Sequence, residues 1–175
     1  MRVNRIIEST IILIVVLFML LSIIDQLNAG ELTTAEYIQH LCTNGHYRRT
    51  VDNQEAQELA RAFESASLKF KIPVGLLVAI GYRESVFRME NQIGDDGKSH
   101  GLMQVGRKGR RDCFCDMDTL QGQINCGACW LNKGRSWCKS LDGGLCAYIN
   151  GECECKTVNS QRAFLIRKRI AEGLK

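Results

Sequence analysis

Apolar side chains recur every three or four residues along most of the chain, a pattern typical of amphipathic helices. The clearest example covers residues 53–70, where Asn53 can cap the first turn. After Pro73, a very apolar helix is predicted from Val74 to about Tyr82. Further helices are predicted at 34–43, 119–133, 139–149 and 160–173. Because strand patterns are weak throughout, the predicted fold class is mainly α, in a single domain.

The helical pattern stops between Arg88 and Asp118, where glycine recurs five times. Glycine is the strongest local interruption of regular structure, so loops and a short hairpin are predicted there. The last helix carries four basic residues that we expect on an exposed face: Arg162, Arg167, Lys168 and Arg169.

The N-terminus has the pattern of an export signal. Arg2 and Arg5 precede an apolar run from Ile11 to Ile24. Residues 1–29 are therefore interpreted as a signal peptide or an uncleaved membrane anchor, with residues 6–24 in the membrane if uncleaved. The positive N-terminus stays inside and residues 30–175, the predicted domain, are exported.

All nine cysteines lie beyond the apolar run. In an exported chain such density indicates a disulfide framework, and the odd count leaves one thiol over. The alternative is a zinc site, for which Cys126 and Cys129 have suitable spacing. Residues 30–50 are expected to belong to the fold, with Cys42 as a staple to the cysteine-rich half. The net charge of +4 is too mild to indicate a nucleic-acid partner.

The candidate catalytic and binding residues lie in three short motifs: Arg83–Phe87, Gly101–Val105 and Ala147–Gly151. In the first, Glu84 stands where the very apolar helix ends. Poor solvation disfavours a charged carboxylate, so its pKa is expected to rise, as a general acid requires. The alternative for Glu84 is a solvated carboxylate paired with Arg83 or Arg88.

The order of these motifs, between about residues 56 and 151, resembles the lysozyme-like superfamily of lytic transglycosylases (SLT) and goose-type lysozymes. It is especially similar to the small transglycosylases of secretion, conjugation or phage systems. The resemblance implies a lysozyme-like domain that cleaves the β-1,4 bond between N-acetylmuramic acid and N-acetylglucosamine in peptidoglycan, without a metal or cofactor. It also implies a periplasmic or inner-membrane-anchored location facing the cell wall.

The family's site residues transfer onto matching positions here. Glu84 would be the catalytic acid/base, and Ser85 would hydrogen-bond near it and hold the local turn. Gln104 would contact the substrate from the floor of the cleft, with Met103 packing beneath. Tyr148 would donate a hydrogen bond that orients Glu84.

Two positions leave the mechanism open. Where the family has asparagine after the tyrosine, this chain has Ile149, and Asn150 follows one place later. Asp95 is a possible second carboxylate, which a water-using muramidase needs and a transglycosylase does not. Three functions therefore remain: a transglycosylase using Glu84 alone, a goose-type muramidase using Glu84 and Asp95, and an inactive wall-binding module. A zinc-binding cysteine module is the weakest alternative.

Overall fold

Helices make up most of the computed structural model, which describes residues 32–88, 93–94 and 97–174. The elements run in the order α2 (Thr34–Asn44), α3 (Asn53–Phe70), α4 (Val74–Ser85), β1 (Ile93–Gly94), β2 (Ser99–His100), β3 (Val105–Gly106), α5 (Arg107–Asp112), α6 (Leu120–Cys138), α7 (Leu141–Asn150) and α8 (Val158–Glu172). The predicted mainly α fold class is therefore confirmed for these residues.

The predicted export segment, residues 1–29, lies outside the described residues. The described part of the chain belongs to one unit, which starts at Leu32. Among the helices that the structure describes, none has both the length and the apolar character that a bilayer span requires.

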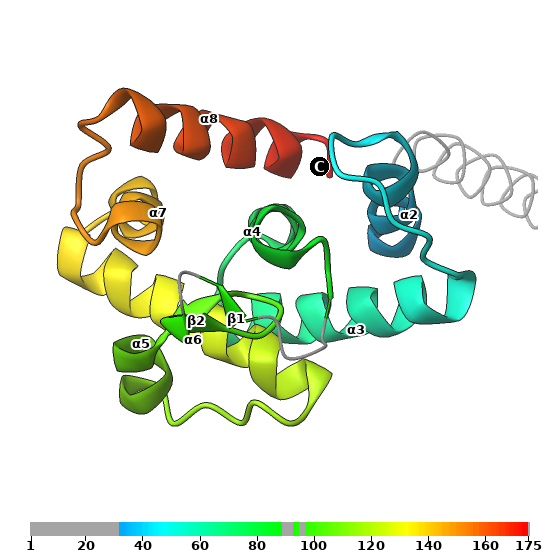
Figure 1. Ribbon diagram of the computed structural model, residues 1–175, viewed down its shortest axis with the longest axis horizontal. Coiled ribbons are helices and arrows are strands. Elements are labelled where there is room, and N and C mark those ends of the chain that lie inside the picture. Colours follow the sequence, from blue (N-terminus) through cyan, green and yellow to red (C-terminus); the bar gives the residue numbers. More distant parts are fainter. Residues whose placement is uncertain (1–31, 89–92, 95–96, 175) are drawn as a thin grey trace, which may run out of the picture. The chain divides into compact units, whose positions relative to one another are not determined.

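Helix α4 occupies the centre of this unit. It is seen almost end-on in the middle of Figure 1 and contacts α2, α3, α6 and α8. Nine of its twelve residues are buried, which agrees with the predicted burial on most sides. Such a helix is hydrophobic all round because neighbours cover every face.

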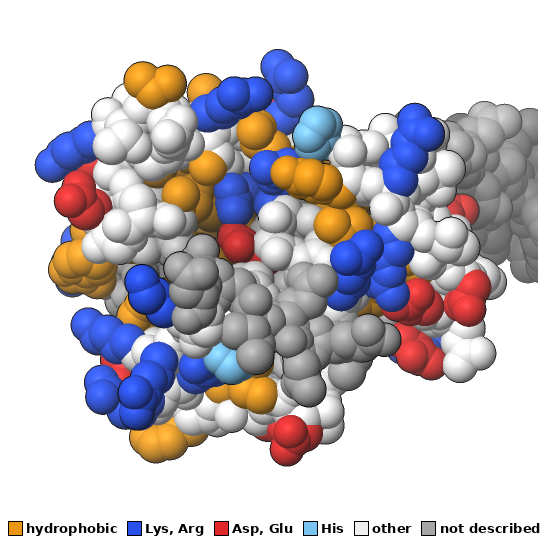
Figure 2. All heavy atoms as spheres, viewed as in Figure 1, with side chains coloured by type: hydrophobic (Ala, Val, Ile, Leu, Met, Phe, Trp, Pro, Cys, Tyr) orange, Lys and Arg blue, Asp and Glu red, His pale blue; other side chains and the backbone are white. Residues whose placement is uncertain are grey.

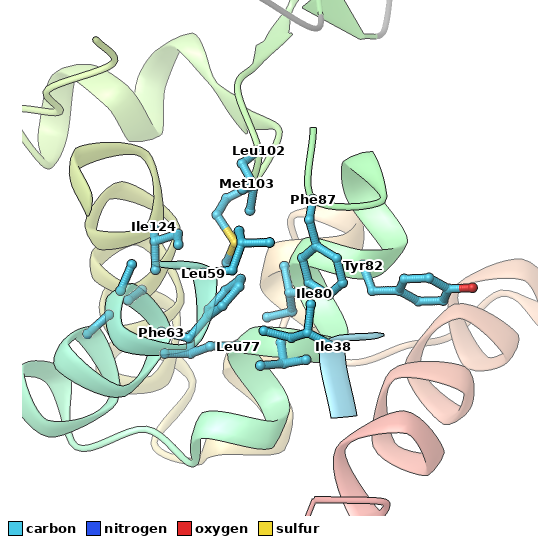
Figure 3. Packing of buried hydrophobic residues seen from close by; sticks show 14 of the residues in the cluster. Ile38, Leu59, Phe63, Leu77, Ile80, Tyr82, Phe87, Leu102, Met103 and Ile124 are labelled. Carbon is cyan, nitrogen blue, oxygen red and sulfur yellow. The ribbon is translucent and has the colours of Figure 1, made fainter. Parts of the chain in front are cut away.

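The core surrounds the C-terminal half of α4 (Figure 3). Phe63 of α3 meets Phe87 edge to face, with ring centroids 5.8 Å apart, and Tyr82 lies against the same Phe87 ring. Burying each such side chain contributes roughly 1.5–3 kcal/mol. These contacts fix the end of α4, and therefore the position of Glu84.

The helix ends differ from the sequence prediction by a few residues. Helix α2 starts with a capping box between Thr33 and Glu36. For α3 the cap is Asp52, whose side chain accepts from the Glu55 N–H, and Asn53 is already the first helical residue. Helix α4 continues past Tyr82 to Ser85.

The glycine-rich region between α4 and α6 contains a small antiparallel sheet in the order β1-β2-β3. Its register pairs Ile93 with His100, and His100 with Val105. The short helix α5 follows the sheet directly and has no counterpart in the predicted elements. The predicted hairpin is present as β1 and β2, and the β2–β3 connection is the Gly101–Gln104 turn.

Eight cysteines form four disulfides, which confirms the disulfide framework. The pairs are Cys113–Cys129, Cys115–Cys126, Cys138–Cys153 and Cys146–Cys155. Cysteines oxidised in this way do not offer the thiolates that zinc binds. Four disulfides are typical of an oxidising compartment.

Cys42 is the one described cysteine without a disulfide, and it is buried in the core. The predicted staple from Cys42 to the cysteine-rich half is therefore wrong. Helix α2 is instead held by packing, with Ile38 and Leu41 buried beside Cys42. From Leu32 onward the chain belongs to the same compact unit as the rest of the described residues.

Candidate active site

Glu84 is the penultimate residue of α4, and the chain turns sharply just after it. The N–H groups of Val86 and Phe87 donate to the carbonyls of Tyr82 and Gly81, which ends the helix. Both Val86 (φ 55°) and Phe87 (φ 59°) adopt the left-handed region. For residues that are not glycine this conformation costs on the order of 1–3 kcal/mol each, and such strain gathers at functional sites.

Arg49 stabilises this strained turn from the α2–α3 connection. One guanidinium nitrogen donates to the Phe87 carbonyl at 2.9 Å and to the Val86 carbonyl at 3.3 Å. The other guanidinium nitrogen donates to the carboxylate of Glu55 on α3. The backbone that follows Glu84 is therefore tied to a neighbouring helix.

The carboxylate of Glu84 forms an ion pair with Arg167 of α8. Glu84 Oε1 accepts a hydrogen bond from Arg167 Nη2 at 2.6 Å. The Glu84 side chain is 21% exposed, whereas that of Arg167 is only 8% exposed. The second terminal nitrogen of Arg167 donates to the Ala163 carbonyl at 3.0 Å. Glu84 is thus a partly covered carboxylate with a buried cationic partner.

This ion pair corrects two predictions. Arg167 is buried, so its predicted place on the exposed basic face of α8 is wrong. The alternative prediction paired the Glu84 carboxylate with Arg83 or Arg88, but Glu84 pairs with Arg167. The Arg83 guanidinium lies over the Tyr47 ring, 4.9 Å from its centroid. The raised pKa that the apolar helix predicts for Glu84 stays a prediction. Arg167 adds an influence that the prediction did not include, since an arginine at hydrogen-bond distance stabilises the carboxylate form.

The Gly101–Gln104 turn is fixed beside the end of α4. Gly101 has φ +77°, and a Cβ there would lie 2.7 Å from Met117 Cε and 2.9 Å from Gln123 Oε1. The Leu102 N–H donates to Gln123 Oε1 at 2.7 Å, and the Leu102 carbonyl accepts from Ser85 Oγ at 2.8 Å. Ser85, next to Glu84, therefore joins the turn to the helix that carries the carboxylate.

Tyr148 of α7 is joined to the same turn. Its hydroxyl donates to the Met103 carbonyl. Burial raises the pKa of this phenol well above its usual value; the negative charge of Glu84 adds to that effect, and Arg167 opposes it. Glu84 is therefore close enough to act on Tyr148 electrostatically. The Tyr148 hydroxyl nevertheless donates to the Met103 carbonyl, whereas the sequence predicted that it would donate to Glu84.

Met103 and Gln104 occupy opposite sides of the turn. Met103 is buried in the core, and a Cβ on Gly127 of α6 would come within 2.6 Å of its side chain. Gln104 is partly exposed and has φ 46°. Its backbone N–H and side-chain Nε2 both donate to the Gly101 carbonyl, at 3.0 and 2.8 Å. The polar Gln104 thus lies on the accessible side.

Asn150 belongs to a different part of the molecule. It is the last residue of α7 and is exposed. Its side chain accepts from the Glu152 N–H at 3.0 Å and donates to the Glu154 carbonyl at 3.2 Å. Asn150 thus organises the loop after α7. The other open position, Asp95, lies outside the described residues.

The sequence analysis assigned no role in the site to three residues that shape it: Arg167, Gln123 and Arg49. The sequence contains a signal for the burial of Arg167, because this residue stands four residues after Ala163 and three before Ile170, within the apolar stripe of α8. Gln123 and Arg49 act through backbone groups of distant segments, and their sequence neighbourhoods give no sign of that role.

The arrangement places an ionisable, partly exposed carboxylate beside a rigid turn that presents polar groups. Such a carboxylate can exchange a proton with a ligand that lies against the turn. Comparisons of the chain with protein-family models, curated proteins and solved structures find no match.

Proposed function

We propose that the protein is a peptidoglycan lytic transglycosylase with a lysozyme-like domain and Glu84 as its single acid/base. One observation carries the proposal: two distant motifs meet the Gly101–Gln104 turn beside Glu84. Ser85 reaches the turn through the Leu102 carbonyl, and Tyr148 reaches it through the Met103 carbonyl. Ser85 and Tyr148 thus contact the turn with which the sequence resemblance groups them, whereas Asn150 does not.

The proposed reaction has two proton transfers. Glu84 in its acid form gives a proton to the bridging oxygen, and the bond from that oxygen to C1 of N-acetylmuramic acid breaks. The Glu84 carboxylate then takes the proton of the C6 hydroxyl of the same sugar, whose oxygen bonds to C1. A 1,6-anhydro ring forms, the leaving sugar keeps the first proton, and Glu84 is an acid again.

Arg167 has a defined part in this cycle. Its guanidinium stabilises the carboxylate form of Glu84, which the second transfer requires. The first transfer requires the acid form, which Glu84 regains at the end of each cycle. The strained turn after Ser85, held by Arg49, would keep the carboxylate at a fixed position during both transfers.

The test is loss of turbidity of a peptidoglycan suspension with wild type and Glu84→Gln. We expect the variant to lose roughly 10²–10⁴-fold in rate, the usual contribution of general acid–base catalysis. Glu64→Gln, an exposed substitution on α3, is the matched control and should retain full activity. Full activity in Glu84→Gln would overturn the assignment.

Mass spectrometry of the products distinguishes the remaining alternatives. Anhydro-muramic ends indicate the transglycosylase, whereas reducing ends indicate a goose-type muramidase that uses Glu84 and Asp95. If wild type leaves the wall intact and Glu84→Gln binds glycan equally well, the protein is a wall-binding module. We also propose that the protein is exported to the periplasm, where it is either anchored in the inner membrane or free. There it would serve a secretion, conjugation or phage apparatus.

A further inference from the structure

A hollow of about 580 Å³ opens beside Tyr148, on the side where α5, α6 and α7 meet. Three aromatic side chains line it: Trp130 and Trp137 of α6, and Tyr148 of α7. We call it the tryptophan pocket. Its volume falls within the range of small-molecule sites, which are mostly apolar with a few polar groups for orientation.

The sequence of α6 builds one wall of the pocket. Trp130, Gly134 and Trp137 are four and three residues apart, so they lie on one face of the helix. Trp137 is 62% exposed, an unusual position for a residue with so much apolar surface. Gly134 contributes no side chain, and a Cβ there would lie 3.0 Å from the Gly144 carbonyl oxygen of α7. The absence of a side chain at Gly134 thus lets α6 and α7 pack closely at this point of the pocket wall.

The charges around the pocket are mainly positive. Lys108 of α5 and Lys133 of α6 line it and are exposed, and neither makes an ion pair with another described residue. Asp112, the acidic lining residue, is paired with Arg111 at 3.1 Å. Figure 2 shows Lys and Arg side chains gathered over the region of α5. A ligand with carboxylates would meet two lysines here that pair with no other described residue.

Tyr148 connects the pocket with the candidate site. Its ring lines the pocket, and its hydroxyl holds the Met103 carbonyl of the turn beside Glu84. A saccharide that extends from the turn across the Tyr148 ring would therefore continue into the tryptophan pocket. The apolar C–H face of a sugar ring packs against aromatic rings and leaves its hydroxyls and substituents at the rim.

We infer that the tryptophan pocket binds the peptide-bearing N-acetylmuramic acid of the glycan strand, with Lys108 and Lys133 pairing with carboxylates of the peptide stem. The inference rests on the proposed function and adds a substrate preference. The enzyme selects glycan that still carries its acidic peptides over stripped glycan.

Binding is measured with Glu84→Gln, which is expected to hold ligand without turning it over. The two probes are a GlcNAc–MurNAc disaccharide with a tripeptide ending in a free carboxylate and the same disaccharide without peptide, each titrated by calorimetry. We expect the peptide-bearing probe to bind roughly tenfold more tightly, equivalent to two exposed ion pairs. Equal affinity for the two probes would overturn the inference.

Pocket variants in the same background identify the contacts. Combined Lys108→Gln and Lys133→Gln should remove the difference between the probes and leave the peptide-free probe unchanged. Trp137→Ala should weaken both. Lys139→Gln, an exposed change just after α6 and outside the pocket, is the matched control. An unchanged preference in the double lysine variant would contradict the assignment.

The two proposals fail in different ways. If wild type leaves peptidoglycan uncut but the lysine-dependent preference is present, the proposed reaction is wrong and the pocket assignment stands. If anhydro products form at equal kcat/KM from intact and amidase-stripped glycan, and the lysine substitutions change neither value, the pocket assignment alone is wrong.

Discussion

Residues 32–87 and residues 113–155 are stabilised by different means. Eight of the twelve largest fully buried side chains lie in residues 32–87, and residues 113–155 supply only Ile124 and Leu131. All four disulfides lie within residues 113–155, whereas the cysteine of the first region, Cys42, is unpaired. The first region thus supplies most of the large buried side chains, whereas the second combines a smaller share of the core with four covalent cross-links.

The candidate site joins these two regions. Glu84 comes from the region with the large core, and Tyr148 comes from the cross-linked region. The disulfides close short loops, with separations of 9 to 16 residues. In the chain-entropy description, each such link contributes about 2.5–3 kcal/mol by restricting the unfolded chain.

The largest effect is expected from the core of the first region. Phe63→Ala removes a fully buried ring that touches Phe87, and we expect a loss of about 3–5 kcal/mol in the free energy of unfolding. Phe114→Ala is the same change at a 93% exposed position in the cross-linked region, and it should cost almost nothing. Urea unfolding measures both. Similar losses in the two variants would contradict the contrast between the regions.

The next largest effect is expected from removing one cross-link. The double variant Cys146→Ala and Cys155→Ala opens a link with a sequence separation of 9, and should lower the free energy of unfolding by about 2–3 kcal/mol. Hydrogen exchange should speed up in α7 and in the loop that follows it, while α3 and α4 stay protected. Equal loss of protection in α3 would show that the regions are not stabilised separately.

A smaller effect is expected where the cross-linked region meets the turn. Tyr148→Phe removes the hydrogen bond to the Met103 carbonyl and should cost about 1–2 kcal/mol, since the carbonyl loses its donor. Tyr47→Phe, at an exposed tyrosine, is the control for loss of a hydroxyl. Thermal unfolding of the three proteins provides the measurement, and an unchanged Tm in Tyr148→Phe would contradict the proposed connection.

The smallest effect is a pH dependence of the first region. Burial raises the pKa of the Cys42 thiol from 9.0 to about 11. Below pH 9 the thiol is protonated in both states, and its contribution is fully present. As pH rises from 9 to 11 the unfolded chain releases this proton while the native protein keeps it, so stability falls. At pH 10 the loss should be about 1 kcal/mol.

Cys42→Ala lacks this titration, so comparison of urea midpoints at pH 7, 8.5 and 10 isolates it. The stability difference between wild type and Cys42→Ala should change in favour of the variant as pH rises. A difference that stays constant over this range would contradict the assigned pKa.

Much of the fold was predictable because helical spacing of apolar residues is a local signal. The helices at 34–43 and 53–70 were placed within one residue, and the buried character of α4 followed from its composition. The short helix α5 was not predicted, since six residues with basic side chains and a glycine have no apolar period. Disulfide pairing was also inaccessible, because pairing depends on which chain segments lie close in space.

The candidate site was predictable only in part. The sequence identified Glu84, Ser85 and Tyr148, which the structure places around one turn. The prediction that Arg167 is exposed was wrong, because it followed the charge of the residue and not its position in the apolar stripe of α8. The sequence also grouped Asn150 with the site by analogy, whereas its hydrogen bonds belong to the loop after α7.

The burial of Cys42 has a consequence for the lifetime of the protein. A thiolate attacks disulfides, and the native fold suppresses this reaction by burying the thiol and raising its pKa. Whenever α2 opens, the thiol becomes able to exchange with the four cross-links elsewhere in the chain. The correct pairing of the cysteine-rich region therefore depends on how rarely a helix that contains none of the paired cysteines detaches.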